Sequence, residues 1–279
     1  MKRTIATISL LSVLAGGCSV ANLTAPADLE AIASAADIDI DQQYEIYSEV
    51  LATYVDDSGY VDYVGLQQNR QQLDEFLAAM ALVSDETYAS WSEADQIAFW
   101  INAYNAFTLV SIINQEPIKA SIKDITGVWR FNEHAVQGKS ITLDHMEHQI
   151  LRVDFNEPRL HAAIVCAAVS CPPLRSEPFT GEALDKQLDD QVEMFLAKTD
   201  GLEIDQSTGV VYLSKIFDWF GDDWNATYET DDGFAGSTAQ KSVLNFVSNY
   251  VSAEEAAYLQ AGNYDVRYFN YDWSLNDQS

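Results

Sequence analysis

The chain has 279 residues, 48% of them hydrophobic and 11% aromatic, so it can bury one large core or two small ones. Its formal net charge is −28, with the acidic residues spread along the chain rather than gathered in a tail. Such a charge repels phosphate backbones and anionic headgroups. It argues against nucleic acid as a partner and against electrostatic binding to a membrane surface.

The first residues have the pattern of an export signal. Lys2 and Arg3 precede an apolar stretch from Ile5 to Leu14, and small residues then lead to Cys18. The stretch is shorter than the roughly 20 residues that span a bilayer, as expected of a signal peptide. A cysteine at the cleavage point resembles a bacterial lipoprotein signal, in which Cys18 becomes the lipidated first residue. Ser19 after it favours the outer membrane, and ordinary secretion is the alternative.

These observations predict the organisation of the chain. We expect a lipoprotein-type signal peptide at residues 1–17, a flexible tether rich in Ala, Asp and Ser at 18–36, and a single domain at 37–279. The protein would then be exported and anchored through the lipid on Cys18, at the outer membrane and facing the periplasm.

The first half of the predicted domain has helical periodicity. Apolar residues at helical spacing predict one helix over 47–54 and another over 73–80, with a short extended segment at 60–64 between them. Residues 92–95 form a candidate capping box for a third helix from about Ile97 to Ile113. That helix is apolar nearly all round, so we expect it to be central and buried.

Asn102 and Asn105 interrupt this apolar helix and share one of its faces. A buried amide must find hydrogen-bonding partners or cost a few kcal/mol. The two residues are therefore either clips that hold a neighbouring loop or orienters that line a site.

Helices and strands alternate in the second half. Residues 160–169 form an unbroken apolar run, which predicts a strand buried on both faces. The other patterns predict, in chain order, a helix over 142–152, a helix over 181–197, a hairpin of 202–205 with 210–213, a helix around 243–250, a helix capped at Ser252, and a strand over 266–271. The fold class is therefore α+β, with helices packed around a small, mainly antiparallel sheet in a single domain.

Cys166 and Cys171 are the only cysteines after Cys18, and two interpretations of them are open. An exported protein meets an oxidising compartment, which favours a disulfide between them. Alternatively, one is a nucleophile activated by a histidine. On a continuous strand His161 and Cys166 would point to opposite faces, so Cys171, paired with His161 or His148, is the better candidate.

A metal site is the third interpretation. His148, Glu147, His161 and a cysteine have the ligand types that zinc prefers, but their spacing is not diagnostic. We therefore expect no cofactor and keep zinc as an alternative. His134 and His145 are expected to be solvated.

Six blocks of sequence together resemble one family. They are Ala98–Asn105, Leu143–His148, Arg159–Cys166, Ser170–Leu174, Tyr212–Phe217 and Tyr271–Asn276. Their order and spacing, from about Tyr60 to Asn276, are similar to the domain of unknown function 547 family. The resemblance implies bacterial exported proteins with plant relatives and carries no established activity. It groups the following residues as the expected site: Asn102, Asn105, Glu147, His148, His161, Cys166 and Cys171.

The leading hypothesis is a thiol-dependent hydrolase or acyl transferase acting on peptide or amide bonds. Cys171 would be the nucleophile, His148 or His161 the base, and Glu147 the group that orients the base. Asn102 or Asn105 would stabilise the oxyanion. One alternative is a non-catalytic envelope domain, in which a Cys166–Cys171 bridge shapes a pocket for a small molecule, peptide or protein. The other is a zinc-binding hydrolase.

Overall fold

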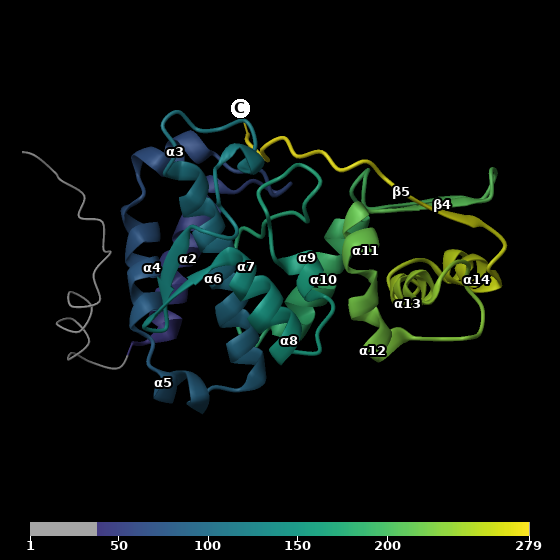
Figure 1. The fold of residues 1–279 in the computed structure, drawn as a ribbon, viewed down its shortest axis with the longest axis horizontal. Helices are drawn as coiled ribbons and strands as arrows, with labels where there is room; N and C mark the ends of the chain where they lie inside the picture. Colours follow the sequence, from purple (N-terminus) through teal and green to yellow (C-terminus); the bar gives the residue numbers. More distant parts are fainter. Residues whose placement is uncertain (1–37, 279) are drawn as a thin grey trace, which may run out of the picture. The chain divides into compact units, whose positions relative to one another are not determined.

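The computed structural model describes residues 38–278, which belong to one compact unit. Most of these residues are in helices (Figure 1). The strands form one sheet of two strands and one sheet of three. The predicted α+β class is thus confirmed, with two small sheets in place of one. The predicted signal peptide, tether and Cys18 lie outside the described residues.

Four helices pack around a central one in the first half of the domain. They are α2 (Ile40–Tyr54), α3 (Tyr63–Gln68), α4 (Gln71–Leu82) and α5 (Asp85–Ser90), and the central helix is α6 (Glu93–Ile113). Helix α2 packs on α4, with the Tyr47 ring stacked on Phe76 at 4.3 Å between ring centroids. The prediction of an extended segment at 60–64 is wrong beyond Val61. The Asp62 side chain accepts a hydrogen bond from the Gly65 N–H and starts α3 there.

The central helix forms as the sequence predicts. Ser92 and Asp95 make the reciprocal hydrogen bonds of a capping box at its first turn. Every residue from Ile97 to Ile113 is buried. By length and composition alone, α6 is the one helix among residues 38–278 that could cross a membrane, but 94% of its most apolar window is buried inside the domain. It is the core helix.

A hairpin and a long helical stretch follow. The short turn η1 (Ile122–Asp124) precedes the antiparallel strands β1 (Glu133–Val136) and β2 (Lys139–Thr142), which sequence reasoning did not predict. The helix predicted over 142–152 is present as three continuous pieces. These are α7 (Leu143–His145), the π-helical η2 (Met146–Leu151) and α8 (Arg152–Asp154).

The expectation that His134, on β1, is solvated is wrong. Its ring stacks on Phe107 at 4.6 Å between centroids, and its buried Nε2 atom has no hydrogen-bond partner among residues 38–278. Burial disfavours the protonated ring and lowers the pKa of His134 to about 4. His145, by contrast, is exposed as predicted.

The strand predicted over 160–169 is wrong. The segment begins as a short helix, α9 (Leu160–Ala163), and continues as extended chain outside any sheet, with one bridge between Ala168 and Leu275. Its main-chain groups bond instead to a side chain of α6 and to the end of the chain. Without a continuous strand, the expectation that His161 and Cys166 must point to opposite faces no longer holds.

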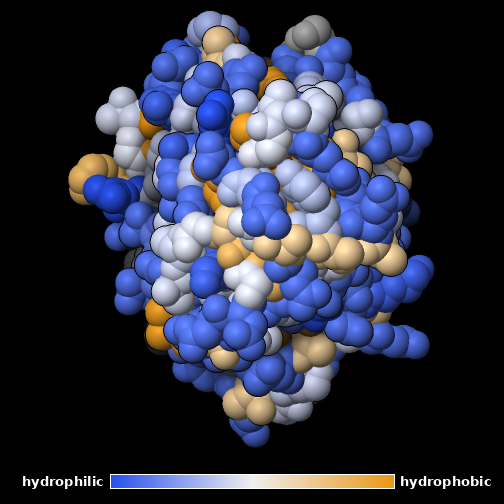
Figure 2. All heavy atoms as spheres, turned by 90° about the vertical axis from the view of Figure 1, so that its right-hand side faces the viewer, coloured by the Kyte–Doolittle hydropathy of each residue, from blue (hydrophilic) through white to orange (hydrophobic). Residues whose placement is uncertain are grey.

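The rest of the chain forms the second sheet and the helices beside it. The elements are α10 (Leu184–Leu196), β3 (Leu202–Asp205), β4 (Val210–Leu213), α11 (Lys215–Phe220), η3 (Gly221–Trp224), α12 (Asn225–Tyr228), α13 (Thr238–Val247), α14 (Ala253–Ala261) and β5 (Asp265–Tyr268). Strand β4 pairs antiparallel with β3, as predicted for the hairpin, and parallel with β5. The surface on the α13 and α14 side is largely hydrophilic, with small scattered apolar patches (Figure 2).

Two hydrophobic clusters meet at α9. Leu160 and Ala163 belong to the cluster around α6, whereas Ala162 belongs to the cluster of α10, β4 and α13. Residues 269–278, here called the C-terminal strap, run from β5 back to the first cluster (Figure 1). The strap is held by main-chain hydrogen bonds, among them Val169 N–H to the Ser274 carbonyl and Val61 N–H to the Asn276 carbonyl.

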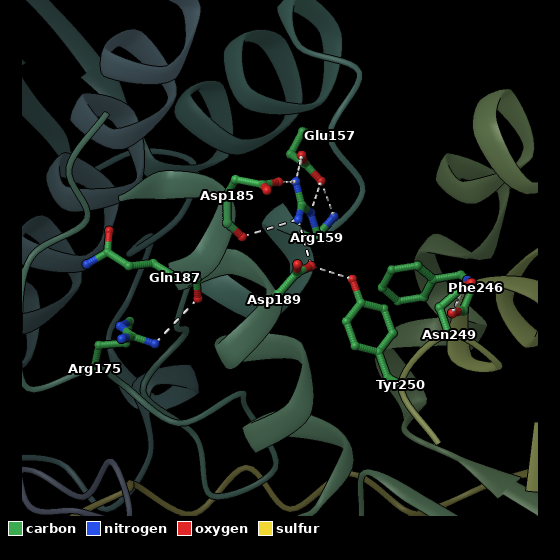
Figure 3. Close-up of polar contacts among 9 residues, drawn as sticks. All are labelled: Glu157, Arg159, Arg175, Asp185, Gln187, Asp189, Phe246, Asn249 and Tyr250. Carbon is green, nitrogen blue, oxygen red and sulfur yellow. Dashed lines mark hydrogen bonds and ion pairs between the residues drawn. The ribbon is translucent and has the colours of Figure 1, made fainter. Parts of the chain in front are cut away.

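An ion-pair network connects the start of α9 to neighbouring elements. The half-buried guanidinium of Arg159 donates to the carboxylates of Glu157, Asp185 and Asp189, at 2.7 to 2.9 Å (Figure 3). Asp189 also accepts a 2.7 Å hydrogen bond from the Tyr250 hydroxyl, beyond the end of α13. One arginine thus connects the start of α9 with α10 and the α13 region.

Candidate functional site

A pocket of about 490 Å³ lies where α9, the helical stretch α7–η2, α11 and the C-terminal strap meet. Most of its lining is apolar or aromatic, and five of the predicted site residues take part: Glu147, His148, His161, Cys166 and Cys171. The other lining residues are Tyr104, Lys123, Ile125, Thr126, Gly127, Val128, Trp129, Arg130, Phe131, Asp144, Ile164, Pro172, Ile216, Trp219, Phe220, Tyr271 and Trp273.

The two cysteine sulfurs lie at disulfide distance in the pocket wall. Cys166 Sγ and Cys171 Sγ are 2.15 Å apart. The Tyr271 hydroxyl contacts both sulfurs at 3.1 Å, and the Cys166 N–H donates to Cys171 Sγ at 3.0 Å. Within the described chain no histidine is a hydrogen-bond partner of either sulfur. The arrangement is the disulfide alternative drawn from the sequence.

Asn102 and Asn105 sit behind the pocket and are not part of its lining. The Asn105 amide donates to the Ala163 carbonyl at 3.0 Å and accepts from the Val165 N–H at 2.8 Å. Asn102 makes the same pair of bonds with both main-chain groups of Phe179, at 2.7 and 2.9 Å. Each amide thus makes the two main-chain hydrogen bonds that a neighbouring strand would otherwise make. Both residues therefore act as clips that hold a loop, the first of the two roles considered from the sequence. Asn105 holds the chain immediately before Cys166.

Sequence reasoning missed the carboxylate that orients the histidines. His161 Nε2 is 2.7 Å from Asp223 Oδ2, in η3. Arg152 makes a bidentate ion pair with the same carboxylate, at 2.6 and 2.8 Å, and donates through its third nitrogen to His148 Nδ1 at 2.9 Å. Asp223 therefore connects both histidines of the pocket, directly or through Arg152.

The electrostatics of this group favour an ionised Asp223. Partial burial alone would raise the pKa of its carboxyl, but hydrogen bonds from His161 and Arg152 and their positive charge outweigh it and hold the pKa of Asp223 well below its usual range. Phe220 packs on the group from one side. The His161 ring stacks on it at 4.6 Å between centroids, and the Arg152 guanidinium lies 4.8 Å from its centre.

Glu147 is placed differently from the orienting role expected of it. Its Oε2 accepts a 3.0 Å hydrogen bond from the Tyr104 hydroxyl, and its Oε1 is 3.9 Å from His148 Nδ1, which already accepts from Arg152. Burial and the negative charge of Glu147 raise the pKa of Tyr104 well above its ordinary value, so the hydroxyl stays protonated. The pair contributes a hydrogen-bonded polar group to the lining, on the helical stretch that also supplies Asp144 and His148.

Aromatic rings form another part of the lining. Tyr271 and Trp273 of the strap lie 4.6 Å apart between centroids, and Trp219 of α11 contacts them at 4.8 and 5.8 Å. Lys123 Nζ lies 4.9 Å from the centre of the Trp273 ring. Trp219 and Phe131 are 43% and 81% exposed, a high fraction for large apolar side chains.

The metal alternative has less geometric support in residues 38–278. No group of three or more His, Cys, Asp or Glu side chains there is arranged to hold a metal ion.

Fold and site together define a single α+β domain with an aromatic pocket whose wall carries a disulfide pair. Residues 88–196 match the model of a family described as "Protein of unknown function, DUF547". The matched segment holds all seven predicted site residues, whereas Asp223, Tyr271 and Trp273 lie beyond it. Comparisons with curated proteins and with solved structures gave no match.

Proposed function

We propose that the protein is a non-catalytic binding domain that holds a small, mainly apolar or aromatic ligand in this pocket. The observation that carries the proposal is a preformed cavity of about 490 Å³, walled by aromatic rings and by two cysteines bonded to each other. Small-molecule sites are commonly concave, largely apolar and supplied with a few polar groups that fix orientation. Trp219, Tyr271 and Trp273 provide the rings, and the Glu147–Tyr104 pair provides a polar group.

The same contacts support binding over thiol catalysis. A cysteine nucleophile needs a thiolate and a nearby base, and both sulfurs are committed to one bond. His161 is hydrogen-bonded to Asp223 and His148 to Arg152, while the amides of Asn102 and Asn105 are used by main-chain groups. None of the four is a hydrogen-bond partner of Cys171 Sγ within the described residues, and the groups that catalysis would require have other partners.

A titration with an uncharged aromatic dye tests the proposal. N-phenyl-1-naphthylamine should bind saturably at one site and raise its fluorescence, because the pocket is apolar. Trp219→Ala removes an exposed ring of the wall and should weaken binding about tenfold, the effect of losing roughly 1.4 kcal/mol of contact. Val153→Ala is the matched control, because Val153 is also exposed and does not line the pocket.

Two results would contradict the proposal. One is dye uptake that never saturates. The other is equal affinity for the wild type and for the Trp219→Ala variant, with both proteins shown to be folded by circular dichroism.

We also propose that the domain acts in the cell envelope, anchored through a lipid on Cys18 at the outer membrane and facing the periplasm. The support is the order of basic, apolar and small residues before Cys18. Labelling of expressing cells with radioactive palmitate should mark the wild type and leave a Cys18→Ser variant unmarked; a labelled variant would refute the anchor.

A further inference from the structure

The two sulfurs of the pocket wall differ in access. Cys166 is half-buried, whereas Cys171 is 1% exposed. Both line the pocket. A thiolate that entered the pocket would therefore reach the sulfur of Cys166 more easily. In thiol–disulfide exchange the sulfur that is attacked keeps the new bond and the other sulfur leaves, so access would make Cys171 the leaving group.

The hydrogen bonds of the pair favour the same direction. Cys171 Sγ accepts from the Cys166 N–H at 3.0 Å and contacts the Tyr271 hydroxyl at 3.1 Å. Burial raises the pKa of Tyr271, so its hydroxyl remains a donor at neutral and mildly alkaline pH. The Tyr271 hydroxyl contacts Cys166 Sγ at the same 3.1 Å, so the Cys166 N–H is the donor that distinguishes Cys171 Sγ. A donor directed at a sulfur stabilises a thiolate there, and a better-stabilised thiolate leaves faster.

The loop that carries Cys171 is held on several sides. Lys198 Nζ donates to the Cys171 carbonyl at 2.6 Å and also to the Val169 carbonyl. The Cys171 N–H bonds to the Ala168 carbonyl at 3.0 Å, and the Ser170 N–H bonds to the strap at Asp272. None of these contacts involves the sulfurs. Cleavage of the sulfur–sulfur bond would therefore leave Cys171 in place with its donors.

We propose that the Cys166–Cys171 bridge exchanges with a small apolar thiol bound in the pocket. The thiolate attacks Cys166 Sγ, a bond forms between the two sulfurs, the Cys166–Cys171 bond breaks, and its electron pair goes to Cys171 Sγ. A second thiol of the same kind then attacks the sulfur of the first. Two thiols become one disulfide, and both cysteines are reduced. This exchange involves only Cys166 and Cys171 of the pocket wall. The proposal therefore does not depend on the identity of the pocket's natural ligand.

Benzyl mercaptan, a small aromatic thiol, is the probe for the wild-type protein. After a brief reaction, acid quenching and alkylation of new thiols with N-ethylmaleimide, peptide mass spectrometry should find the benzylthio group on Cys166 and the maleimide on Cys171. Oxidised glutathione in the same reaction is the control disulfide, and its reduction shows that the thiol is reactive. A benzylthio group mainly on Cys171 overturns the proposal. So does a bridge that stays intact while the glutathione is consumed.

The Tyr271→Phe variant tests the leaving-group step and keeps the aromatic ring. Loss of the hydroxyl donor should slow adduct formation about tenfold, as expected for one hydrogen bond to a charged group. Tyr212→Phe, which removes a hydroxyl outside the pocket, should react at the wild-type rate. In a Cys166→Ser background, Tyr271→Phe should raise the pKa of the Cys171 thiol, because the thiolate loses a hydrogen-bond donor, and a merely structural role would not cause this change. An unchanged rate and an unchanged pKa would contradict the step.

Discussion

Replacement of Asn105 by alanine should lower the free energy of unfolding by about 3 kcal/mol, because it leaves two buried main-chain groups without partners at about 1–3 kcal/mol each. The side chain is buried and spans from α6 to the Ala163 carbonyl and the Val165 N–H. Urea unfolding followed by tryptophan fluorescence measures the effect. We also expect a faster exchange of the Val165 amide proton, because that N–H loses its acceptor.

Thr108→Val is the matched control on the same helix. Thr108 is buried like Asn105, but its hydroxyl has no hydrogen-bond partner among the described residues. Its replacement by an apolar side chain of the same shape should change stability by less than about 1 kcal/mol, or increase it. Equal losses in the two variants would show that Asn105 acts through packing and not as a clip.

Asp223→Asn should be the second strongly destabilising change, by about 2–3 kcal/mol at pH 7. It removes the negative charge that pairs with Arg152 and faces His161, and it replaces one of the two acceptor oxygens with an NH2 donor. Removal of one partner of a partly buried ion pair leaves the other uncompensated. The pH dependence follows from the lowered pKa of Asp223. A carboxyl whose folded pKa lies below its unfolded value, about 3.9, stabilises fully above that value and loses its effect as the pH falls below it.

Unfolding measured across pH 3 to 7 therefore checks two features of the Asp223→Asn variant. Its deficit should be constant above about pH 5 and should shrink below about pH 4. Asp222→Asn is the control, since Asp222 is the exposed neighbouring carboxylate, with one hydrogen bond to Asn225. It should change stability by less than about 0.5 kcal/mol. A deficit that grows with acid, or an equal deficit in both variants, would refute the assigned role of Asp223.

Local signals in the sequence predicted the longer helices and the β3–β4 hairpin, but not the short helices α5, α9, α11 and α12 or the pairing of β5 with β4. The capping box at Ser92 and the apolar residues after it specify α6 without any tertiary information. The β1–β2 hairpin escaped notice because its turn is formed by Gln137 and Gly138, both with positive φ, of 54° and 66°. Asn-Gly is the usual signal for such a turn, and glutamine at the first position does not announce it.

The strand predicted over 160–169 shows where local reasoning fails. An apolar run fits a buried strand or any buried extended chain, and the difference lies in what pairs with its main chain. Here the partners are Asn105, some 60 residues earlier, and the strap, some 105 residues later. No local pattern contains either of them.

The candidate site was predictable in part for the same reason. Glu147, His148, His161, Cys166 and Cys171 could be grouped from blocks of sequence, and the structure brings them to one pocket. Asp223 stands in a short polar turn before Trp224, and only the tertiary fold places that turn beside His161. Asp223 thus supplies the orienting carboxylate that had been expected of Glu147.

The thiol state of the purified protein tests the central claim most directly, because binding and thiol catalysis require different states of Cys166 and Cys171. Protein prepared without reductant is unfolded in N-ethylmaleimide, digested and analysed by mass spectrometry. The binding account predicts one linked peptide pair joining Cys166 to Cys171, with neither cysteine alkylated. Quantitative alkylation of both cysteines, in protein that binds the aromatic dye normally, would contradict it and restore Cys171 as a candidate nucleophile.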